Sequence, residues 1–552
     1  MKKYLFIALA ALGFAACAEK DEMGNQPINN GEKEQSYVAV TFTADGVTRA
    51  DKDYDEGLGE ERAVHEAVVF FFKNGAPFYV KYDDRNNTST NEGSYNYLKI
   101  KLQDNDPASN TPNVSDIKDE VLVLENYKGQ YPNQMLAILN WSPKKSSYTL
   151  SELQSEISAL GSDSKGYVMS NAVYADAAKD AVKTVIDAVK ITEANISTDK
   201  DTALKNPVNI YVERIAAKVS FSAEKEGIFP IGEQVSNAEG GDDVMGDAPV
   251  DVYARIEGFQ LYNDFEDSHL LKHIDPTWGG DSFGFTNWND PDYHRSYWAM
   301  SQTKDFPNNT FNWNNNYTAL DAKKPFVYCG ENTQADKHTK VIVKATLVKK
   351  VGGNYESLEV VNWYGKNYIG EKQLKIVVAN TLKHTYFTFD SATSKYIGIA
   401  PEDLKCVARK APEKNAYEVY FQLSDGAVGK DWYKFDEFKS DYEKYSTSAV
   451  LDGELKVNVQ PALVYKSGQT YYYTDIKHLG LPNSTTEFGV VRNHVYKVNI
   501  TDIKGFGTPV YDPTIDIITP ETPKDMKTFV SAQINILSWR IVEEDYQLGE
   551  DY

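Results

Sequence analysis

The sequence contains little cysteine, with three cysteines among 552 residues. Cys17 lies near the N-terminus, so only Cys329 and Cys406 remain for the body of the chain, which excludes a fold held by a disulfide framework. These two thiols either pair in an oxidising compartment or stay buried and free, and the sequence leaves both alternatives open. A chain of this length has enough residues for two to three domains with apolar cores.

Positive charge is also scarce. The chain has 58 Lys and Arg against 80 Asp and Glu, which gives a net charge of −22 and a pI near 4.9. A nucleic-acid partner is excluded because nothing in this balance could neutralise a run of phosphates. The acidity instead favours solubility in an extracellular setting.

Catalytic motifs are absent or lie in the wrong context. One G-x-S-x-G match, centred on Ser282, lies in a loop-like stretch, whereas a nucleophile elbow joins a core strand to a helix. His65 lacks the second histidine of an H-E-x-x-H motif, and His269 and His273 stand four apart in a strand-rich segment where this spacing need not share a face. We therefore expect no enzyme activity and no catalytic, cofactor-binding or metal-binding residues.

Long apolar runs are missing except at the N-terminus. Lys2 and Lys3 precede an apolar run that ends at Cys17, which is the layout of an export signal with a lipobox-like end. No other run approaches the roughly 18 apolar residues needed to span a bilayer. We expect residues 1–16 to be a signal peptide and Cys17 to carry lipid; the alternative is an ordinary signal peptide with an incidental cysteine.

Sheet-forming residues are abundant. Aromatic residues make up 12% of the chain, and 37 of them are tyrosines, which favours an all-β or β-rich fold. Val38, Val40 and Phe42 alternate with small or polar residues in the pattern of a half-buried strand. Asn74 and Gly75 separate two apolar runs, as in a β-hairpin. Strands are also expected at 97–102, 120–124 and 134–141, and short helical insertions at 151–160 and 175–189.

The most regular strand pattern, residues 206–225, changes phase at Glu213 and Arg214. We interpret it as one element that passes from a first domain into a second, with the boundary at Arg214. A pair of β-sandwiches, residues 50–214 and 215–507, accommodates the many short strands. The strands expected in the second are 254–263, 340–348, 374–378, 417–423, 455–459, 469–473 and 490–500.

A long loop, residues 264–316, is rich in Trp, Asn, Asp and Gly. Its aromatic side chains either stack on sugars or form a buried cluster under the loop. The first alternative would make the protein a surface glycan-binding lipoprotein. The aromatic residues concerned are Trp278, Trp288, Tyr293, Trp298 and Trp313.

Arg49 precedes Ala50 in a segment rich in Asp, Gly and Thr. An exposed arginine in such a loop is an accessible site for a trypsin-like protease, and the alternative is a solvated arginine without function. Cleavage here would make residues 17–49 a propeptide that includes the strand with Val38, Val40 and Phe42.

The chain ends with a strand-like stretch, residues 527–541, behind a segment with four prolines, residues 505–526. Prolines make this segment a stiff, extended leash that reaches about 60 Å at roughly 3.3 Å per residue. A slip in the alternation between Ile536 and Leu537 predicts a β-bulge. The stretch has no partner within its own sequence neighbourhood, so we hypothesise that it docks on another molecule. The side chains that would fill the partner are Ala532, Ile534, Ile536, Leu537, Trp539 and Ile541.

Several segments together resemble the fimbrillins of the Bacteroidales, and within them the shaft subunits of short (Mfa-type) fimbriae. None of these segments would suffice alone, but they are spread over nearly the whole chain. They are GFAAC (13–17), Arg49, VERIAAKVS (212–220), YCGENT (328–333), VIVKATL (341–347), VVRNHVYKVNITDIKGFG (490–507) and the terminal strand with Trp539.

The resemblance implies two tandem transthyretin-like β-sandwich domains and a C-terminal donor strand within residues 508–552. It also implies a lipid-anchored precursor at the outer membrane, cut after Arg49 by a trypsin-like protease and assembled into a cell-surface fimbria by donor-strand exchange. The partners implied are other copies of the chain and the anchor and tip subunits of the fimbria. Adhesion, aggregation and biofilm formation are the functions expected of such a polymer.

Overall fold

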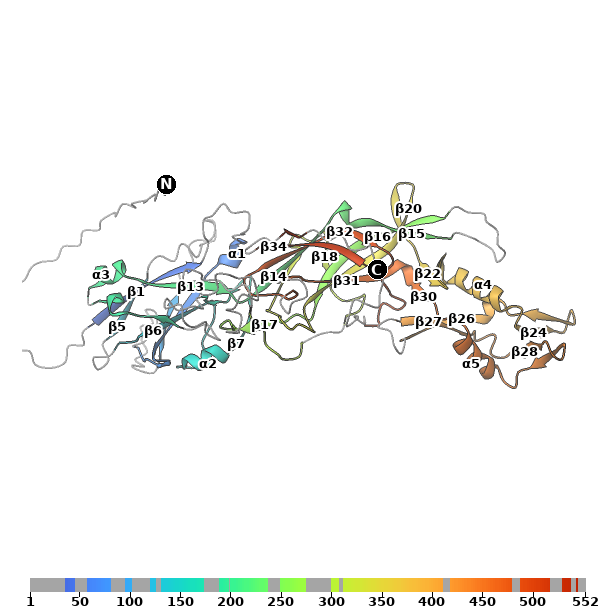
Figure 1. The fold of residues 1–552 in the computed structure, drawn as a ribbon, viewed down its shortest axis with the longest axis horizontal. Helices are drawn as coiled ribbons and strands as arrows, with labels where there is room; N and C mark the ends of the chain where they lie inside the picture. Colours follow the sequence, from blue (N-terminus) through green and yellow to red (C-terminus); the bar gives the residue numbers. More distant parts are fainter. Residues whose placement is uncertain are drawn as a thin grey trace, which may run out of the picture.

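The computed structural model is elongated, and its sheets follow one another along the long axis (Figure 1). It is rich in strands with few short helices, which confirms the predicted all-β class with helical insertions. In the part of the chain that the structure describes, no helix is long and apolar enough to cross a membrane. The described residues are 35–44, 57–80, 95–101, 120–125, 131–172, 188–197, 199–236, 249–274, 299–306, 311–410, 417–478, 487–516, 529–537 and 543–544.

The first sheet has ten strands, in the order β12-β1-β13-β10-β6-β2-β3, with β4, β5 and β11 attached beside this path. Its central strands β2 and β6 are buried on both faces because nearly every side chain in them is apolar. Val68 and Phe70 pack into one cluster, and Val69 and Phe71 into another on the opposite face. The strands are β1 (Gln35–Ala44), β2 (Glu66–Lys73), β3 (Ala76–Pro77), β4 (Tyr97–Lys101), β5 (Glu120–Glu125), β6 (Gln134–Leu139), β10 (Met169–Asn171), β11 (Val189–Lys190), β12 (Ile196–Ser197) and β13 (Val208–Arg214).

The predicted hairpin turn joins β2 to β3, and both of its central residues, Asn74 and Gly75, have positive φ. The helices of this part are α1 (Gly59–Arg62), α2 (Leu150–Ser155) and α3 (Lys200–Lys205). The predicted helix 151–160 is shorter than expected because α2 ends at Ser155 and a strand follows, whereas the one at 175–189 falls almost wholly outside the described residues. Small strand pairs complete the region: β7 (Ile157–Ala159) with β17 (Asp267–His269), and β8 (Gly161–Ser162) with β9 (Gly166–Tyr167).

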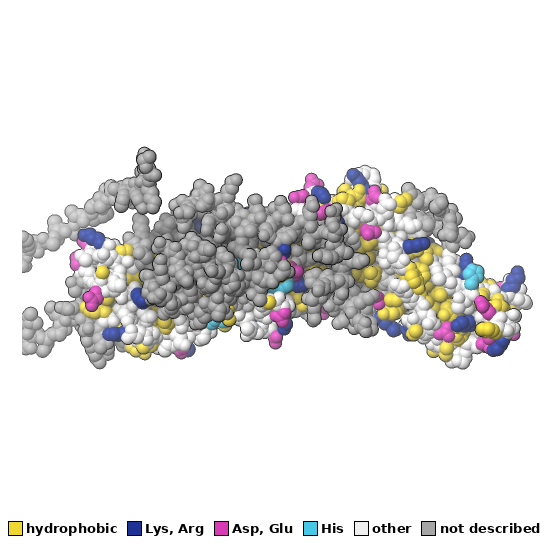
Figure 2. Space-filling model, in the orientation of Figure 1, with side chains coloured by type: hydrophobic (Ala, Val, Ile, Leu, Met, Phe, Trp, Pro, Cys, Tyr) yellow, Lys and Arg dark blue, Asp and Glu magenta, His cyan; other side chains and the backbone are white. Residues whose placement is uncertain are grey.

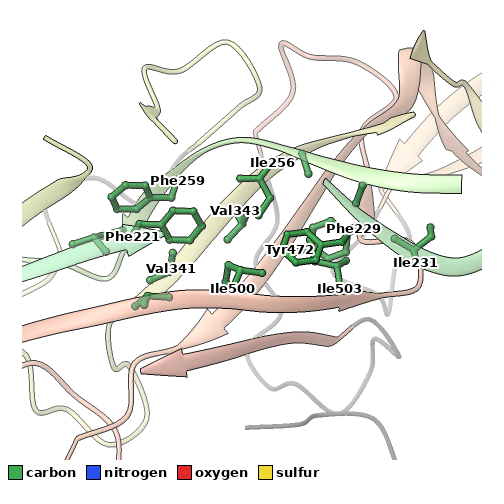
Figure 3. Packing of buried hydrophobic residues seen from close by; sticks show 14 of the residues in the cluster. Phe221, Phe229, Ile231, Ile256, Phe259, Val341, Val343, Tyr472, Ile500 and Ile503 are labelled. Carbon is green, nitrogen blue, oxygen red and sulfur yellow. The ribbon is translucent and has the colours of Figure 1, made fainter. Parts of the chain in front are cut away.

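The chain leaves the first sheet at Arg214 and enters a β-sandwich at Ala217. Two sheets face each other across one core, in which the Phe221 and Phe259 rings stack with centroids 4.6 Å apart (Figure 3). One sheet holds β19 (Phe326–Cys329), β14 (Ala217–Ala223), β32 (Val495–Lys504), β34 (Phe529–Leu537) and β35 (Glu543–Glu544). The other holds β15 (Ile228–Val235), β16 (Val250–Tyr262), β18 (Thr318–Ala319), β20 (Lys340–Val351), β21 (Asn354–Ser357), β31 (Gln469–Asp475) and β33 (Thr508–Pro509).

Residues 360–465, here called the distal module, lie at one end of the molecule (Figure 1) and contribute most of a separate core around Trp432. The predicted strands 374–378 and 455–459 are wrong, since residues 374–378 lie in helix α4 (Gly370–Leu382) and residues 455–458 in helix α5 (Ser448–Asn458). The buried residues Leu374 and Val378 in α4, and Leu451 and Leu455 in α5, are four positions apart, so each pair lies on one face of its helix. The strands are β22 (Val360–Trp363), β23 (Lys366–Ile369), β24 (Tyr386–Asp390), β25 (Lys395–Gly398), β26 (Leu404–Lys410), β27 (Tyr417–Leu423), β28 (Trp432–Asp436), β29 (Asp441–Lys444) and β30 (Leu463–Tyr465).

The stacked pair in the sandwich core gives a test of the packing. Phe259→Ala should lower the free energy of unfolding by about 3 to 5 kcal/mol, because a fully buried ring is replaced by a cavity. Phe438→Ala, the same change at a fully exposed ring, should have little effect. Urea unfolding of the monomer measures both, and equal losses would contradict this account of the core.

Candidate functional site

The strand predicted to be removable is β1, whose backbone runs through Val38, Val40 and Phe42. It lies parallel to β13, with Val40 opposite Val208, and antiparallel to β5 and β12. Because β1 is joined to three strands, its removal would leave open ladder positions in the first sheet. Cys17, Arg49 and Ala50 lie outside the described residues.

Helix α1, which follows the predicted cleavage site, is fixed by contacts that do not involve β1. The Glu61 side chain is fully buried and accepts hydrogen bonds from the Lys218 ammonium at 2.5 Å and from the Tyr328 hydroxyl. The Glu61 backbone carbonyl accepts a hydrogen bond from Arg214 Nε at 2.6 Å. Burial and the bond to Glu61 raise the pKa of Tyr328. These contacts therefore anchor α1, which follows the predicted cleavage site, to β14, to β19 and to the end of β13.

The predicted donor strand is β34, but it has a partner in its own chain. It lies antiparallel to β32, from Val495 opposite Leu537 to Lys504 opposite Phe529. The expectation of a stretch without a neighbouring partner is therefore wrong for the isolated chain. The donor residues Ala532, Ile534, Ile536 and Leu537 lie in β34, whereas Trp539 and Ile541 lie outside the described residues.

Two details of the C-terminal segment also differ from expectation. The register shift of this strand pair is on β32, between Ile500 and Asp502, and Ile536 and Leu537 are paired without a bulge. The expected leash is attached at its start, because Thr508 in β33 pairs with Tyr471 of β31. The extended backbone that proline favours is compatible with this pairing, because a β-strand is itself extended.

The structure does not bring β1 and β34 together. The first belongs to the ten-stranded sheet and the second to the sandwich (Figure 1). The C-terminal strand of a chain therefore does not occupy the place of its own β1.

The three segments 212–220, 328–333 and 490–507 meet between the first sheet and the sandwich, at a place we call the junction. The Asn332 and Val490 backbones exchange hydrogen bonds of 2.8 and 2.9 Å. The Asn493 amide donates to the Ala216 carbonyl at 2.7 Å. Sequence analysis singled out these segments individually, but no spacing signal predicted that they would meet.

Buried ion pairs hold the junction. The Arg492 side chain is fully buried, donates from Nε to Glu331 Oε2 at 2.9 Å, and donates from Nη2 to the His269 carbonyl at 2.6 Å. The Lys272 ammonium donates to Glu213 at 2.9 Å, and both groups are buried. A buried charge without its partner is costly, so these contacts require the segments to keep one relative position.

The pKa values of the buried acids differ because their partners differ. Burial favours the neutral form of Glu331, but the Arg492 guanidinium outweighs it and lowers the pKa of that carboxyl. For Glu213 burial dominates and raises the pKa, although Lys272 acts against it. Burial also lowers the pKa of Lys272. The Arg492–Glu331 pair is thus the one that stays charged most firmly.

Two of the other sequence candidates, His269 and His273, lie side by side in the structure. The His269 and His273 rings stack with centroids 3.8 Å apart, and burial together with His273 lowers the pKa of His269 to about 4. Within the described ranges, no group of three or more His, Cys, Asp or Glu could hold a metal ion. Ser282 lies outside those ranges.

Cys329 and Cys406 are separate free thiols. Cys329 is buried in the sandwich core and Cys406 packs against the core of the distal module, so the two side chains belong to different clusters. Of the loop aromatics, Trp313 packs against Tyr471 with ring centroids 5.5 Å apart, beneath the Lys344 ammonium. Trp278, Trp288, Tyr293 and Trp298 lie outside the described residues.

The fold and the terminal strands define a β-rich protein in which the first and last described long strands complete two different sheets. Residues 463–545 match the family model described as major fimbrial subunit protein type IV, fimbrillin, C-terminal. The matched segment includes β31, β32 and β34. The predicted resemblance to the fimbrillin family is confirmed, and it indicates a structural protein.

No curated protein matches the chain. Among solved structures, it is similar to a fimbrilin (FimA) from Porphyromonas gingivalis W83, with 11% identity, coverage of 91% of this chain and 96% of that one, and a TM-score of 0.33. The tip fimbrial protein Mfa3 from Porphyromonas gingivalis is 9% identical, with coverage of 91% and 99% and a TM-score of 0.29. A fimbrial assembly protein from Parabacteroides distasonis is 11% identical, with coverage of 74% and 98% and a TM-score of 0.26. The resemblance therefore rests on the family model, which matches residues 463–545, and not on these distant likenesses.

Removal of one partner of the buried pair tests the junction. Arg492→Met should destabilise the protein by about 3 to 5 kcal/mol because Glu331 is left buried and unpaired. Adding Glu331→Leu should recover much of this loss. Lys405→Met, which breaks the exposed pair with Asp425, should cost at most about 1 kcal/mol. Urea unfolding of the three variants measures these free energies of unfolding. A free energy of unfolding that is unchanged in Arg492→Met would refute the role of the pair.

The same pair predicts an acid dependence of stability. Because the folded pKa of Glu331 lies below its ordinary value of 4.5, its contribution is complete above that pH and is lost as the pH falls through the folded value. Glu213, with a raised pKa, acts in the opposite direction. Between about pH 6 and about pH 3.5, the melting temperature should fall more for the wild type than for the Arg492→Met/Glu331→Leu variant. Equal falls would contradict the assignment.

Proposed function

We propose that the chain is a structural subunit of a cell-surface fimbria that polymerises by donor-strand exchange. It is exported as a lipoprotein precursor through Cys17 and is cut after Arg49. The observation that carries this proposal is the arrangement at the N-terminus. Strand β1 lies before the cleavage site, and α1 after it is anchored by Glu61. Cleavage therefore frees β1 while the rest of the subunit keeps its contacts.

Cleavage determines whether a second strand can bind beside β13. Before it, β1 occupies the ladder position beside β13, so a second strand gains nothing there. After β1 has left, β13 has an open edge that another strand can fill. In the uncut chain, residues Val40 to Ala44 of β1 are paired with β13. The positions on β13 that they leave unpaired are the ones that a donated strand would fill.

The C-terminal strand supplies the missing element from another copy. In the monomer, β34 covers β32 through nine paired positions. Strand β1 has five paired positions with β13 and six with β5. Because each backbone hydrogen bond is worth about 1 kcal/mol net, a donated strand that pairs with both neighbours would offset the nine-position ladder lost beside β32. The exchange is driven by filling an edge that cleavage has opened, and cis pairing protects the tail until then.

A tail that can be donated favours a shaft subunit over a tip subunit, since a tip subunit need not donate a strand. The polymer would consist mainly of copies of this chain, with anchor and tip subunits at its ends. Adhesion, aggregation and biofilm formation would follow from its position on the cell surface.

The cleavage site is tested by Arg49→Ala. The variant should remain monomeric and retain residues 18–49, because β1 stays in the sheet. Lys52→Ala, a change of a basic residue in the same segment, should leave maturation and polymers unchanged. Mass spectrometry and electron microscopy before and after limited treatment with an arginine-specific protease, which does not cut after Lys52, measure both. Normal polymers from Arg49→Ala would sink the proposal.

The donor role is tested by truncation after Met526. The matured truncated subunit should remain folded but form no polymers, and a peptide of residues 527–552 should bind it. The same peptide should not bind the unprocessed precursor, in which β1 fills the site. Circular dichroism controls for folding, and size-exclusion chromatography with labelled peptide measures binding. Polymers of normal length from the truncated subunit would contradict the donor role.

A further inference from the structure

The four-stranded sheet of the distal module, β25-β24-β28-β29, has an unusual outer face. Its inner side places Tyr386 and Trp432 in the core, where they are 3% and 1% exposed. Directly paired residues share a face of a sheet, and side chains alternate between the two faces along each strand. The residues next to Tyr386 in β24 and next to Trp432 in β28 therefore point outward. The outer face carries six aromatic residues, here called the aromatic face: Phe387, Phe389, Tyr396, Tyr433, Phe435 and Tyr442.

These rings contact one another but remain accessible. The Tyr396 and Tyr442 rings stack with centroids 3.7 Å apart, while Phe435 meets Tyr442 edge-on at 5.1 Å. Phe389 is 46% exposed and Phe435 38% exposed, and Phe438 in the adjoining turn is fully exposed. Eight of the twelve exposed large hydrophobic residues in the described part of the chain lie in the distal module. Figure 2 shows hydrophobic side chains on the surface of this end.

The distal module is also neutral. Residues 360–465 contain 14 Lys and Arg and 14 Asp and Glu, so the rest of the chain carries the whole net charge of −22. Two copies of an acidic chain repel each other at most approaches. The distal module is a part that a second copy can approach without adding to that repulsion.

We propose that the aromatic face binds a second copy of this chain in the assembled fimbria. The inference rests on the proposed function, and it adds a contact that strand exchange does not provide. Protein interfaces are enriched in Tyr and Phe, and a concentrated exposed apolar patch marks such a site. Most ring pairs here are tilted or edge-on, so the face presents ring edges rather than the flat platform that suits a sugar. The face lies at the opposite end of the molecule from the β1 sheet (Figure 1), where a neighbour in an end-to-end polymer would lie.

The test changes exposed rings without touching the core. Phe389→Ser/Phe435→Ser/Phe438→Ser should leave the melting temperature of the monomer nearly unchanged but raise the concentration needed for polymers about tenfold, the effect of losing one strong interface contact. The matched control, Tyr79→Ser/Val351→Ser, changes residues that are 42% and 41% exposed outside the face and should polymerise like the wild type. Sedimentation and electron microscopy of trypsin-matured protein measure polymer formation.

A photo-crosslinking amino acid in place of Phe438 gives a second readout. It should link two copies in polymers and give no such product in uncut monomers. The inference is overturned if the triple variant polymerises like the wild type and no crosslink forms. The same conclusion holds if the triple variant loses saccharide binding but still polymerises normally. A wild type that forms no polymers after cleavage would instead refute the proposed function, and this inference with it.

Discussion

The buried ion pair between Arg492 and Glu331 is the constraint on which the arrangement of the molecule depends. Neither charge tolerates burial alone, so the strand ends that carry them must meet in one geometry. The Lys272–Glu213 pair, also buried, ties the end of β13 to the same place. The first sheet and the sandwich are thereby fixed to each other by buried polar contacts, in addition to an apolar cluster in which Val68 of the first sheet packs with Ile215 and Val491. Under the proposed function, a subunit fixed in this way would keep the same shape at every position of the polymer.

The junction also separates the part of the chain that stays from the part that leaves. Glu61 belongs to the first helix after the proposed cleavage site and is buried among groups from β14 and β19. Strand β1 pairs with β5, β12 and β13 of the first sheet. Under the proposed function, proteolysis opens a vacancy in the first sheet without loosening the junction. Until such a vacancy exists, pairing with β32 of its own chain satisfies the backbone hydrogen-bonding groups of β34 that could otherwise pair with another molecule.

Sequence patterns predicted the strands best where local and tertiary preferences agree. The runs at β2 and β6, the hairpin at Asn74 and Gly75, and the terminal strand follow from apolar residues and turn chemistry alone. Short apolar runs at α4 and α5 were misleading because four or five residues do not distinguish a strand from one face of a helix.

The junction was not predictable, since contacts between residues 331 and 492 join distant parts of the chain. The cis partner of β34 was missed for a similar reason, as proline-rich spacing indicates reach but not destination.

Disulfide trapping at Ile534 tests the central claim most directly. In the uncut precursor with Val498→Cys and Ile534→Cys, whose positions are paired in β32 and β34, a bond should form within one chain. In matured polymers with Ile210→Cys and Ile534→Cys, the bond should form between chains, because Ile210 lies on β13 beside the place of β1. Efficient trapping of the 498–534 bond within single chains of mature polymers, with none between 210 and 534, would contradict strand exchange.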